Sequence, residues 1–291
     1  MKFGLVTDNN HIDIKLPKDH PHTRSVIQNG NVPGDALKVY TGFAKWNRNY
    51  LNTFYPKGIG KKDLEYYSTQ VNCIEMNAFF YRIFPVEVVQ KWYDRSDHDF
   101  IFCPKIPQSI SQFRQLKDCA DKTTSFLESI SHFKEKLGSC FLQMHPTFKP
   151  TKFKDFEQFI INWPTDVKLT VELRHADWYA DLNTANALAQ LLEAYHIGHT
   201  ITDTMGRRDL LHMRMTAPFC FIRFTGTNQD SDYLRIDDWI NRLKDWYHDG
   251  LKEIYFFVHQ NDEHKSMDLY NYFIAGINPH LNCSLNVISK V

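Results

Sequence analysis

The feature that most constrains this chain is a series of eight short apolar runs separated by amphipathic stretches. The runs are continuous rather than alternating, which is typical of parallel strands buried on both faces. Apolar residues three or four apart mark the stretches between them as helices. The runs span residues 37–44, 72–77, 100–105, 139–144, 168–173, 199–203, 219–224 and 253–258.

This alternation predicts an α/β fold, a single (β/α)8 barrel of the TIM type. The weakest unit is the short segment 205–219, which leaves little room for a helix. A doubly wound open sheet is the alternative, but no GxGxxG follows the first run. Helices are expected at 61–70, 86–95, 121–138, 183–196 and 237–249.

The N-terminal residues differ from the rest of the chain. Residues 1–36 are polar and show no sustained period of 2 or 3.6, so we interpret them as an extension outside the barrel domain, which spans 37–291. No apolar stretch is long enough for a membrane helix or a signal peptide, so the sequence predicts a cytoplasmic protein without a membrane partner. Its six cysteines form no CxxC pair, which argues against a disulfide scaffold or a zinc ribbon.

Charge restricts the partners. Lys plus Arg equals Asp plus Glu at 34 each, so no global field attracts nucleic acid, and a charged ligand must be recognised locally. We therefore expect a small-molecule substrate, an anionic one, rather than nucleic acid.

Polar residues gather where the apolar runs end, and active sites of such barrels form at the C-terminal ends of the strands. Glu75 and Glu172 are candidates for acid and base, and Lys105 for stabilising negative charge, acting as an acid or forming a Schiff base. The predicted catalytic residues are Glu75, Lys105, Glu172 and Asp203. The predicted substrate-binding residues are Asn77, Tyr81, Gln143, Arg174, His175, Trp178, Arg223 and Asn261.

Two other interpretations of these residues remain open. They can neutralise one another in a structural ion-pair network, or Glu75, Glu172, His175 and Asp203 can converge on a metal. The cations Lys105, Arg174 and Arg223 oppose a divalent ion, and no HxH, HExxH or DxD spacing is present. The sequence therefore predicts no metal and no cofactor, with an anion held by those cations or at the turn 223–228, where many barrels bind phosphate.

At these same residues the sequence resembles the domain of unknown function 72 family, also called YecE-like. The resemblance spans about residues 38–280, and its most specific segments are FYPKG at 54–58, IEMNAFFYRIFP at 74–85, VELRHADWY at 171–179 and FIRFTG at 221–226. It implies a TIM-type barrel and the importance of the predicted site residues, but no settled activity. The usual FNN after the last strand is replaced by His259, Gln260 and Asn261, of which Asn261 is the secure match.

The leading hypothesis is a barrel enzyme that acts by acid–base chemistry on a small polar, anionic, sugar-phosphate-like substrate. The alternatives are a metal-assisted phosphodiesterase or nucleic-acid-binding barrel, and a non-catalytic ligand-binding module. Convergent carboxylates and cations favour the first hypothesis.

Overall fold

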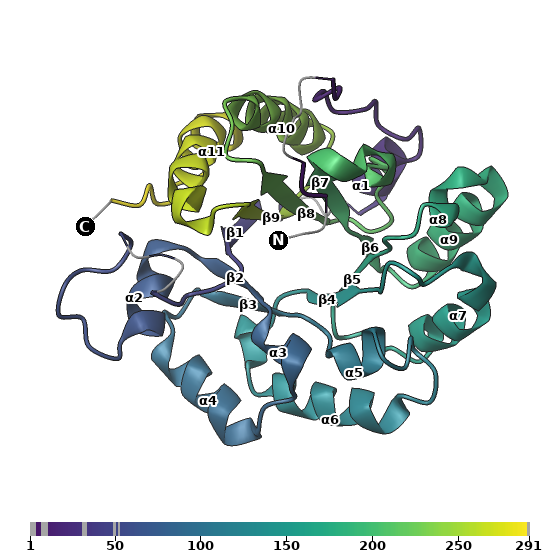
Figure 1. The fold of residues 1–291 in the computed structure, drawn as a ribbon, viewed down its shortest axis with the longest axis horizontal. Helices are drawn as coiled ribbons and strands as arrows, with labels where there is room; N and C mark the ends of the chain where they lie inside the picture. Colours follow the sequence, from purple (N-terminus) through teal and green to yellow (C-terminus); the bar gives the residue numbers. More distant parts are fainter. Residues whose placement is uncertain (1–3, 7–10, 31–33, 49–50, 52, 290–291) are drawn as a thin grey trace.

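The strands of this protein lie at the centre of the molecule, with helices around them (Figure 1). The structure, a computed structural model, describes residues 4–6, 11–30, 34–48, 51 and 53–289. Within these residues no helix is both long and apolar enough to cross a membrane.

The strands form two parallel sheets. The larger has the order β3-β2-β1-β9-β8-β7 and the smaller the order β4-β5-β6. All eight predicted runs contain a strand, which supports the predicted α/β class. Their bounds are β1 Lys38–Phe43, β2 Cys73–Met76, β3 Ile101–Pro104, β4 Cys140–Gln143, β5 Leu169–Glu172, β6 Gly198–His199, β7 Ile201–Thr204, β8 Cys220–Gly226 and β9 Glu253–Gln260.

The two sheets meet at two places. The sixth run is divided by Thr200 into β6, which pairs with β5, and β7, which pairs with β8. On the other side, isolated parallel bridges join Phe102 to Leu137 and Lys105 to Phe141. Among the described strands no ladder joins the two sheets, which have only these local contacts between them.

The helices largely follow the predicted stretches. The expected helix 121–138 ends early, at Ser131, and Lys134 beyond it has a left-handed φ of 50°. Between β7 and β8 the chain forms only a short 3₁₀ helix, Met205–Leu210, as the length of that segment suggested. The α-helices are α1 Thr23–Asn29, α2 Asp63–Gln70, α3 Ala78–Tyr81, α4 Val86–Arg95, α5 Gln108–Ser111, α6 Ala120–Ser131, α7 Phe153–Ile161, α8 Asp177–Ala180, α9 Leu182–Ala194, α10 Ser231–His248 and α11 Ser266–Leu281.

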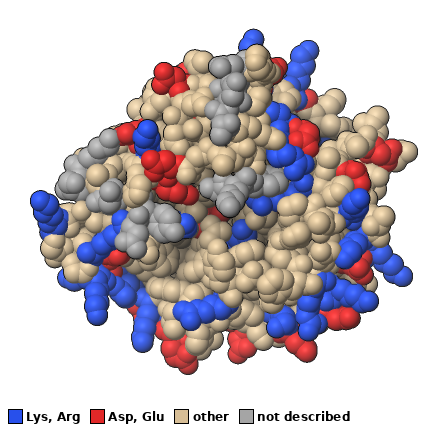
Figure 2. Space-filling view, in the orientation of Figure 1, with Lys and Arg blue, Asp and Glu red and all other residues tan. Residues whose placement is uncertain are grey.

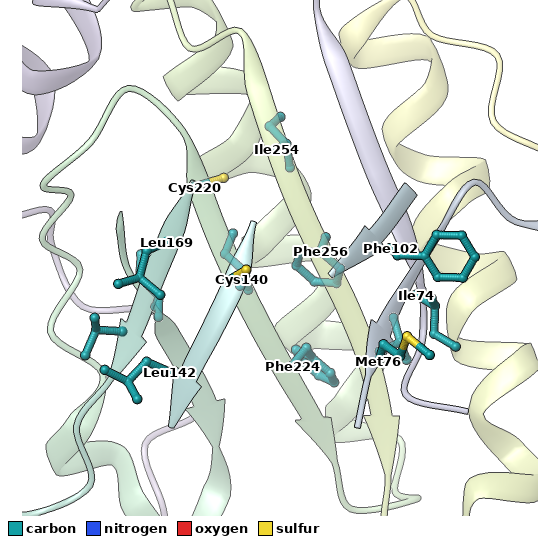
Figure 3. Close-up of a cluster of buried hydrophobic side chains, with 14 of the residues drawn as sticks. Ile74, Met76, Phe102, Cys140, Leu142, Leu169, Cys220, Phe224, Ile254 and Phe256 are labelled. Carbon is teal, nitrogen blue, oxygen red and sulfur yellow. The ribbon is translucent and has the colours of Figure 1, made fainter. Parts of the chain in front are cut away.

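Successive strand residues face opposite sides of the sheets, and this alternation divides the buried residues into two clusters. The larger cluster joins strand residues to the helices, and Figure 3 shows members such as Ile74, Phe102 and Phe256. The smaller cluster lies on the opposite face of the strands. It contains Cys73, Cys103, Phe141, Ala217, Phe219, Phe221, Tyr255 and Phe257.

The N-terminal extension packs against the rest of the chain. Its described residues form α1 and no strand. Thr23 donates through Oγ1 to the carbonyl oxygen of Met213 at 3.0 Å, and Asp19 accepts from Nε1 of Trp246 at 2.9 Å. Ile27 is buried. These contacts join the extension to α10 and to the segment before β8, while the domain boundary near residue 37 stays a prediction.

We expect a chain that starts at Leu37 to unfold in one cooperative transition, but with a lower free energy of unfolding. The loss should be at least about 1.5 kcal/mol, because burial of an isoleucine side chain alone contributes roughly 1.5–3 kcal/mol. Urea unfolding followed by circular dichroism measures it.

Two alanine variants of the full chain serve as a matched pair. Ile27→Ala should cost about 2–5 kcal/mol, whereas Leu5→Ala, at a residue that is 49% exposed, should change stability by less than about 0.5 kcal/mol. A truncated chain without a cooperative transition would show that the extension is integral to the fold.

Candidate functional site

Strand alternation places five polar side chains on the same face of the strands as the smaller apolar cluster. Each lies two residues beyond a member of that cluster: Glu75 follows Cys73, and Arg223 follows Phe221. Residues two apart on a strand share a face, so these side chains continue the inner face toward the C-terminal ends of the strands. The five are Glu75, Lys105, Gln143, Arg223 and His259.

Arg223 is the centre of this group. It is 1% exposed and donates from Nε and Nη2 to the two carboxylate oxygens of Glu75, at 2.7 and 3.0 Å. Its Nη1 donates to Oε2 of Glu172 at 2.8 Å. His259 approaches Glu75 through Nε2 at 3.1 Å, and Arg174 forms an ion pair with Glu172. Two buried carboxylates are thus satisfied by two guanidinium groups.

These contacts determine the protonation of both carboxylates. Burial raises the pKa of Glu75, but Arg223 and His259 outweigh it and hold the pKa well below the usual range. Burial likewise raises the pKa of Glu172, while Arg174 and Arg223 lower it to about 2. An acid–base pair requires environments that push the two pKa values apart. Here both environments lower the pKa. Both carboxylates are therefore ionised, and they hold the side chain of Arg223 in place.

Lys105 is held differently. Its Nζ donates to Oε1 of Gln143 at 2.7 Å, and Nε2 of Gln143 donates to Oε1 of Glu172 at 3.0 Å. The ammonium lies 4.3 Å from the ring centroid of Phe80. Burial and the charge of Arg223 lower the pKa of Lys105 to about 7, although Glu75 and Glu172 oppose this shift. The charge of Lys105 therefore changes near neutral pH.

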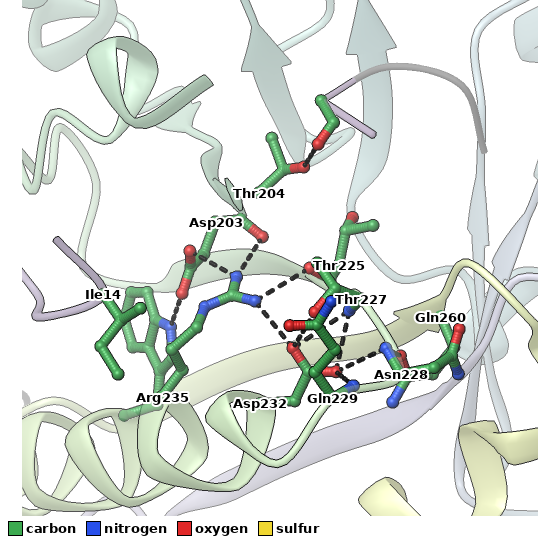
Figure 4. A network of polar contacts seen from close by, with 12 residues as sticks. Ile14, Asp203, Thr204, Thr225, Thr227, Asn228, Gln229, Asp232, Arg235 and Gln260 are labelled. Carbon is green, nitrogen blue, oxygen red and sulfur yellow. Dashed lines mark hydrogen bonds and ion pairs between the residues drawn. The ribbon is translucent and has the colours of Figure 1, made fainter. Parts of the chain in front are cut away.

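Asp203 lies apart from this group, so the expectation that it converges with the other catalytic candidates is wrong. In the parallel register, Thr202 is paired with Arg223 and Asp203 with Phe224, which places Asp203 on the face that packs against the helices. Arg235 donates to Asp203 at 2.6 Å, a contact drawn in Figure 4. Nε1 of Trp239 also donates to Asp203, at 2.8 Å. Asp203 anchors α10 to β7.

The turn after β8, a predicted anion site, is occupied by the protein's own carboxylate. Backbone N–H groups of Thr227, Asn228 and Gln229 all donate to Asp232, the first two at 2.8 Å (Figure 4). Such a set of amides is typical of a phosphate site. Because Asp232 is buried and also pairs with Arg235, this turn is a poor candidate for binding a phosphate group of a substrate.

The remaining predicted substrate-binding residues occupy varied positions. Asn77 joins the cluster, since its Nδ2 donates to Oε1 of Glu75 at 2.9 Å. Tyr81 is 71% exposed at the end of α3. Trp178 is fully buried, with its Nε1 donating to the carbonyl oxygen of Phe148 at 2.7 Å, and this is a packing role. His175 accepts from the backbone N–H of Asp177, which follows it closely.

Asn261 directly follows β9, and its backbone N–H donates to the carbonyl oxygen of Gly226 at 3.2 Å. Two further residues join the cluster beyond those predicted. Phe80 lies against the Lys105 ammonium, and His259 against Glu75. His259 lies two residues beyond Phe257, a member of the smaller cluster, so it shares the inner face of the strand.

The described residues contain no group of three His, Cys, Asp or Glu side chains arranged to hold a metal ion. In particular, Asp203 faces the helices and pairs with Arg235. Glu75 and Glu172 form ion pairs with Arg223. On the face of the molecule shown in Figure 2, acidic and basic side chains are interspersed. Recognition of a charged ligand therefore depends on local contacts.

Asp203→Asn should destabilise the fold by about 3–5 kcal/mol, because it leaves the buried guanidinium of Arg235 without its closest carboxylate. The matched control is Asp209→Asn, the same change at an exposed ion pair with Arg207, which should cost less than about 1 kcal/mol. Urea unfolding compares the two. Equal effects would contradict the structural role of Asp203.

Comparisons with known proteins agree on the family. The profile described as Protein of unknown function DUF72 matches residues 40–286. The chain is 27% identical over 247 residues to the UPF0759 protein YecE of Escherichia coli strain K12, covering 77% of this chain and 87% of that protein, and the O157:H7 protein matches equally.

Solved structures match the fold. Crystal structures of DUF72 family proteins from Enterococcus faecalis V583 and Thermotoga maritima MSB8 superimpose with TM-scores of 0.66 and 0.63, each at 19% identity. They cover 86% and 84% of this chain and 100% of their own chains. The resemblance drawn from the sequence motifs is confirmed: the chain belongs to the DUF72 family.

Proposed function

We propose that this protein is a barrel enzyme that acts on a small, polar, anionic substrate by acid–base chemistry at the C-terminal ends of its strands. The observation that carries the proposal is the position of Lys105. It is a buried amine at a strand end, hydrogen-bonded to a neutral amide, while neighbouring arginines hold both carboxylates. A group that titrates near neutral pH inside such a cluster is suited to proton transfer.

The architecture that we propose is a closed (β/α)8 barrel in which β6 and β7 together act as the sixth strand. Supporting contacts lie on both sides of the smaller sheet. The backbone N–H of Thr200 donates to the carbonyl oxygen of Val171 at 2.9 Å, and that of Ile106 to the carbonyl oxygen of Phe141, also at 2.9 Å. Closure would bring the inner faces of all strands around one axis, where polar side chains at the strand ends meet.

Each residue in the cluster then has a distinct role. Lys105 exchanges the proton. Gln143 orients it, because its amide bridges Lys105 and Glu172. Arg223 is a positioning residue that holds the two glutamates, and Arg174, whose side chain is 11% exposed, places positive charge nearer the solvent for an anionic group of the substrate.

The substrate's anionic group must bind near these cations rather than at the turn after β8. The amides of that turn already bind Asp232. A carboxylate is therefore as suitable as a phosphate, which broadens the sugar-phosphate-like class expected from the sequence to small anionic hydroxy or oxo compounds.

Proton exchange into D₂O tests the proposal. Dihydroxyacetone phosphate and pyruvate have exchangeable hydrogens beside a carbonyl, and ¹H NMR measures their replacement by deuterium. We expect the protein to accelerate exchange of at least one of them roughly tenfold or more over buffer, with a rate that rises through pH 7 as Lys105 loses its proton. General-base catalysis typically contributes about 10²–10⁴-fold, so Lys105→Met should abolish the effect.

Asp209→Asn is the matched control and should leave the exchange rate unchanged. Saturable binding of either compound without accelerated exchange would favour the non-catalytic binding module. Exchange that persists in Lys105→Met would exclude Lys105 as the proton-transferring group.

A further inference from the structure

We infer that Lys105 is a covalent nucleophile, which forms an imine with the carbonyl carbon of a small anionic aldehyde or ketone. This inference rests on the site of the proposed function and names a substrate class for it. On a carbonyl compound the neutral amine of Lys105 attacks the carbonyl carbon instead of accepting a proton. The inference depends on three features of the Lys105 side chain: its contacts, its charged neighbours and its position at a strand end.

The contacts of Lys105 differ from those of other lysines in the described part of the chain. Lys168 forms an ion pair with Glu253, and Lys136, which is also buried, donates to three oxygens of Tyr93 and Ser96. For Lys105 the structure gives one hydrogen bond, to an amide oxygen, and contacts with two aromatic rings. Loss of a proton from Lys105 therefore breaks no ion pair with a residue that the structure describes.

The charged neighbours favour the neutral amine. Arg223 and Arg174 face Lys105 from β8 and from beyond β5, and they are matched by Glu75 and Glu172. Burial and the two guanidinium groups lower the pKa of Lys105 to about 7, so a large fraction is unprotonated at neutral pH. Enzymes activate lysine nucleophiles by such desolvation and by neighbouring cations.

The reaction balances without an external oxidant or reductant. The Nζ lone pair forms a bond to the carbonyl carbon, and the C–O bond then breaks. The oxygen leaves as water with both protons of the neutral amine, and one proton from solvent gives the iminium. Formation of the iminium fixes one positive charge where the two arginines already balance the two glutamates. A negative charge on the ligand compensates it, which selects anionic carbonyl compounds.

Reductive trapping on the intact protein tests this inference. Glyoxylate is supplied with sodium cyanoborohydride at pH 7, and the modified lysines are located by peptide mass spectrometry. We expect Lys105 to be labelled at least tenfold faster than exposed lysines such as Lys122, with a rate that is half-maximal near pH 7. In the same digest the buried Lys136 should remain unlabelled, and Lys105→Arg should lose the fast phase.

Acetaldehyde in place of glyoxylate tests the need for an anion, and the preference for Lys105 should fall with this neutral aldehyde. Labelling of Lys105 no faster than Lys122 would overturn the inference. If deuterium exchange nevertheless depends on Lys105, the acid–base function stands without an imine. Fast labelling of Lys105 without any deuterium exchange would support the nucleophile and overturn the acid–base proposal.

Discussion

The interaction on which the rest of this site depends is the buried pairing of Arg223 with Glu75 and Glu172. Two carboxylates that are at most 2% exposed are stable only if cations and hydrogen bonds replace their water. Arg223 contacts both glutamates at once and is itself buried. Removing one partner of such a group usually costs about 3–5 kcal/mol, because a charge is left uncompensated.

This pairing also determines what Lys105 can do. Because the arginines are the closest cations to Glu75 and Glu172, the lysine has an amide oxygen and aromatic rings as its partners. Its ammonium form is then poorly compensated in a buried position, and the pKa falls. Arg223, Glu75 and Glu172 form a buried ion-pair network. Lys105 is hydrogen-bonded to Gln143 beside this network and is the member to which we assign the chemistry. The structural interpretation of the rim charges and the functional one thus describe different residues of the same group.

Much of this arrangement could be predicted from the sequence. Continuous apolar runs located the strands, and the polar residues at their ends located Glu75, Lys105, Gln143, Glu172 and Arg223. The prediction for Asp203 was wrong because it placed the side chain on the wrong face of the strand. A run that is buried on both sides shows no alternation, so its sequence does not say which residues point inward. The register between β7 and β8 pairs Thr202 with the inward-facing Arg223, which places the next residue, Asp203, on the other face. This register is known only from the structure.

Two other features were beyond sequence patterns. Asp232 lies in α10, and nothing in its local sequence indicates that its carboxylate fills the turn after β8. Trp178 lies in a family motif beside Arg174 and His175, yet it packs beneath the surface against Phe148. Residues of one family motif lie in the same region of the structure. Motif membership does not separate side chains that support the site from those that face a ligand.

We propose that the arginine–glutamate cluster leaves Lys105 as a buried amine that titrates near neutral pH. The most direct measurement is an NMR titration of the protein carrying ¹³C-labelled lysine, with the Lys105 Cε signal assigned by its loss in Lys105→Arg. We expect a midpoint of about 7 for this signal. A midpoint near the ordinary lysine value of about 10.4 would contradict it.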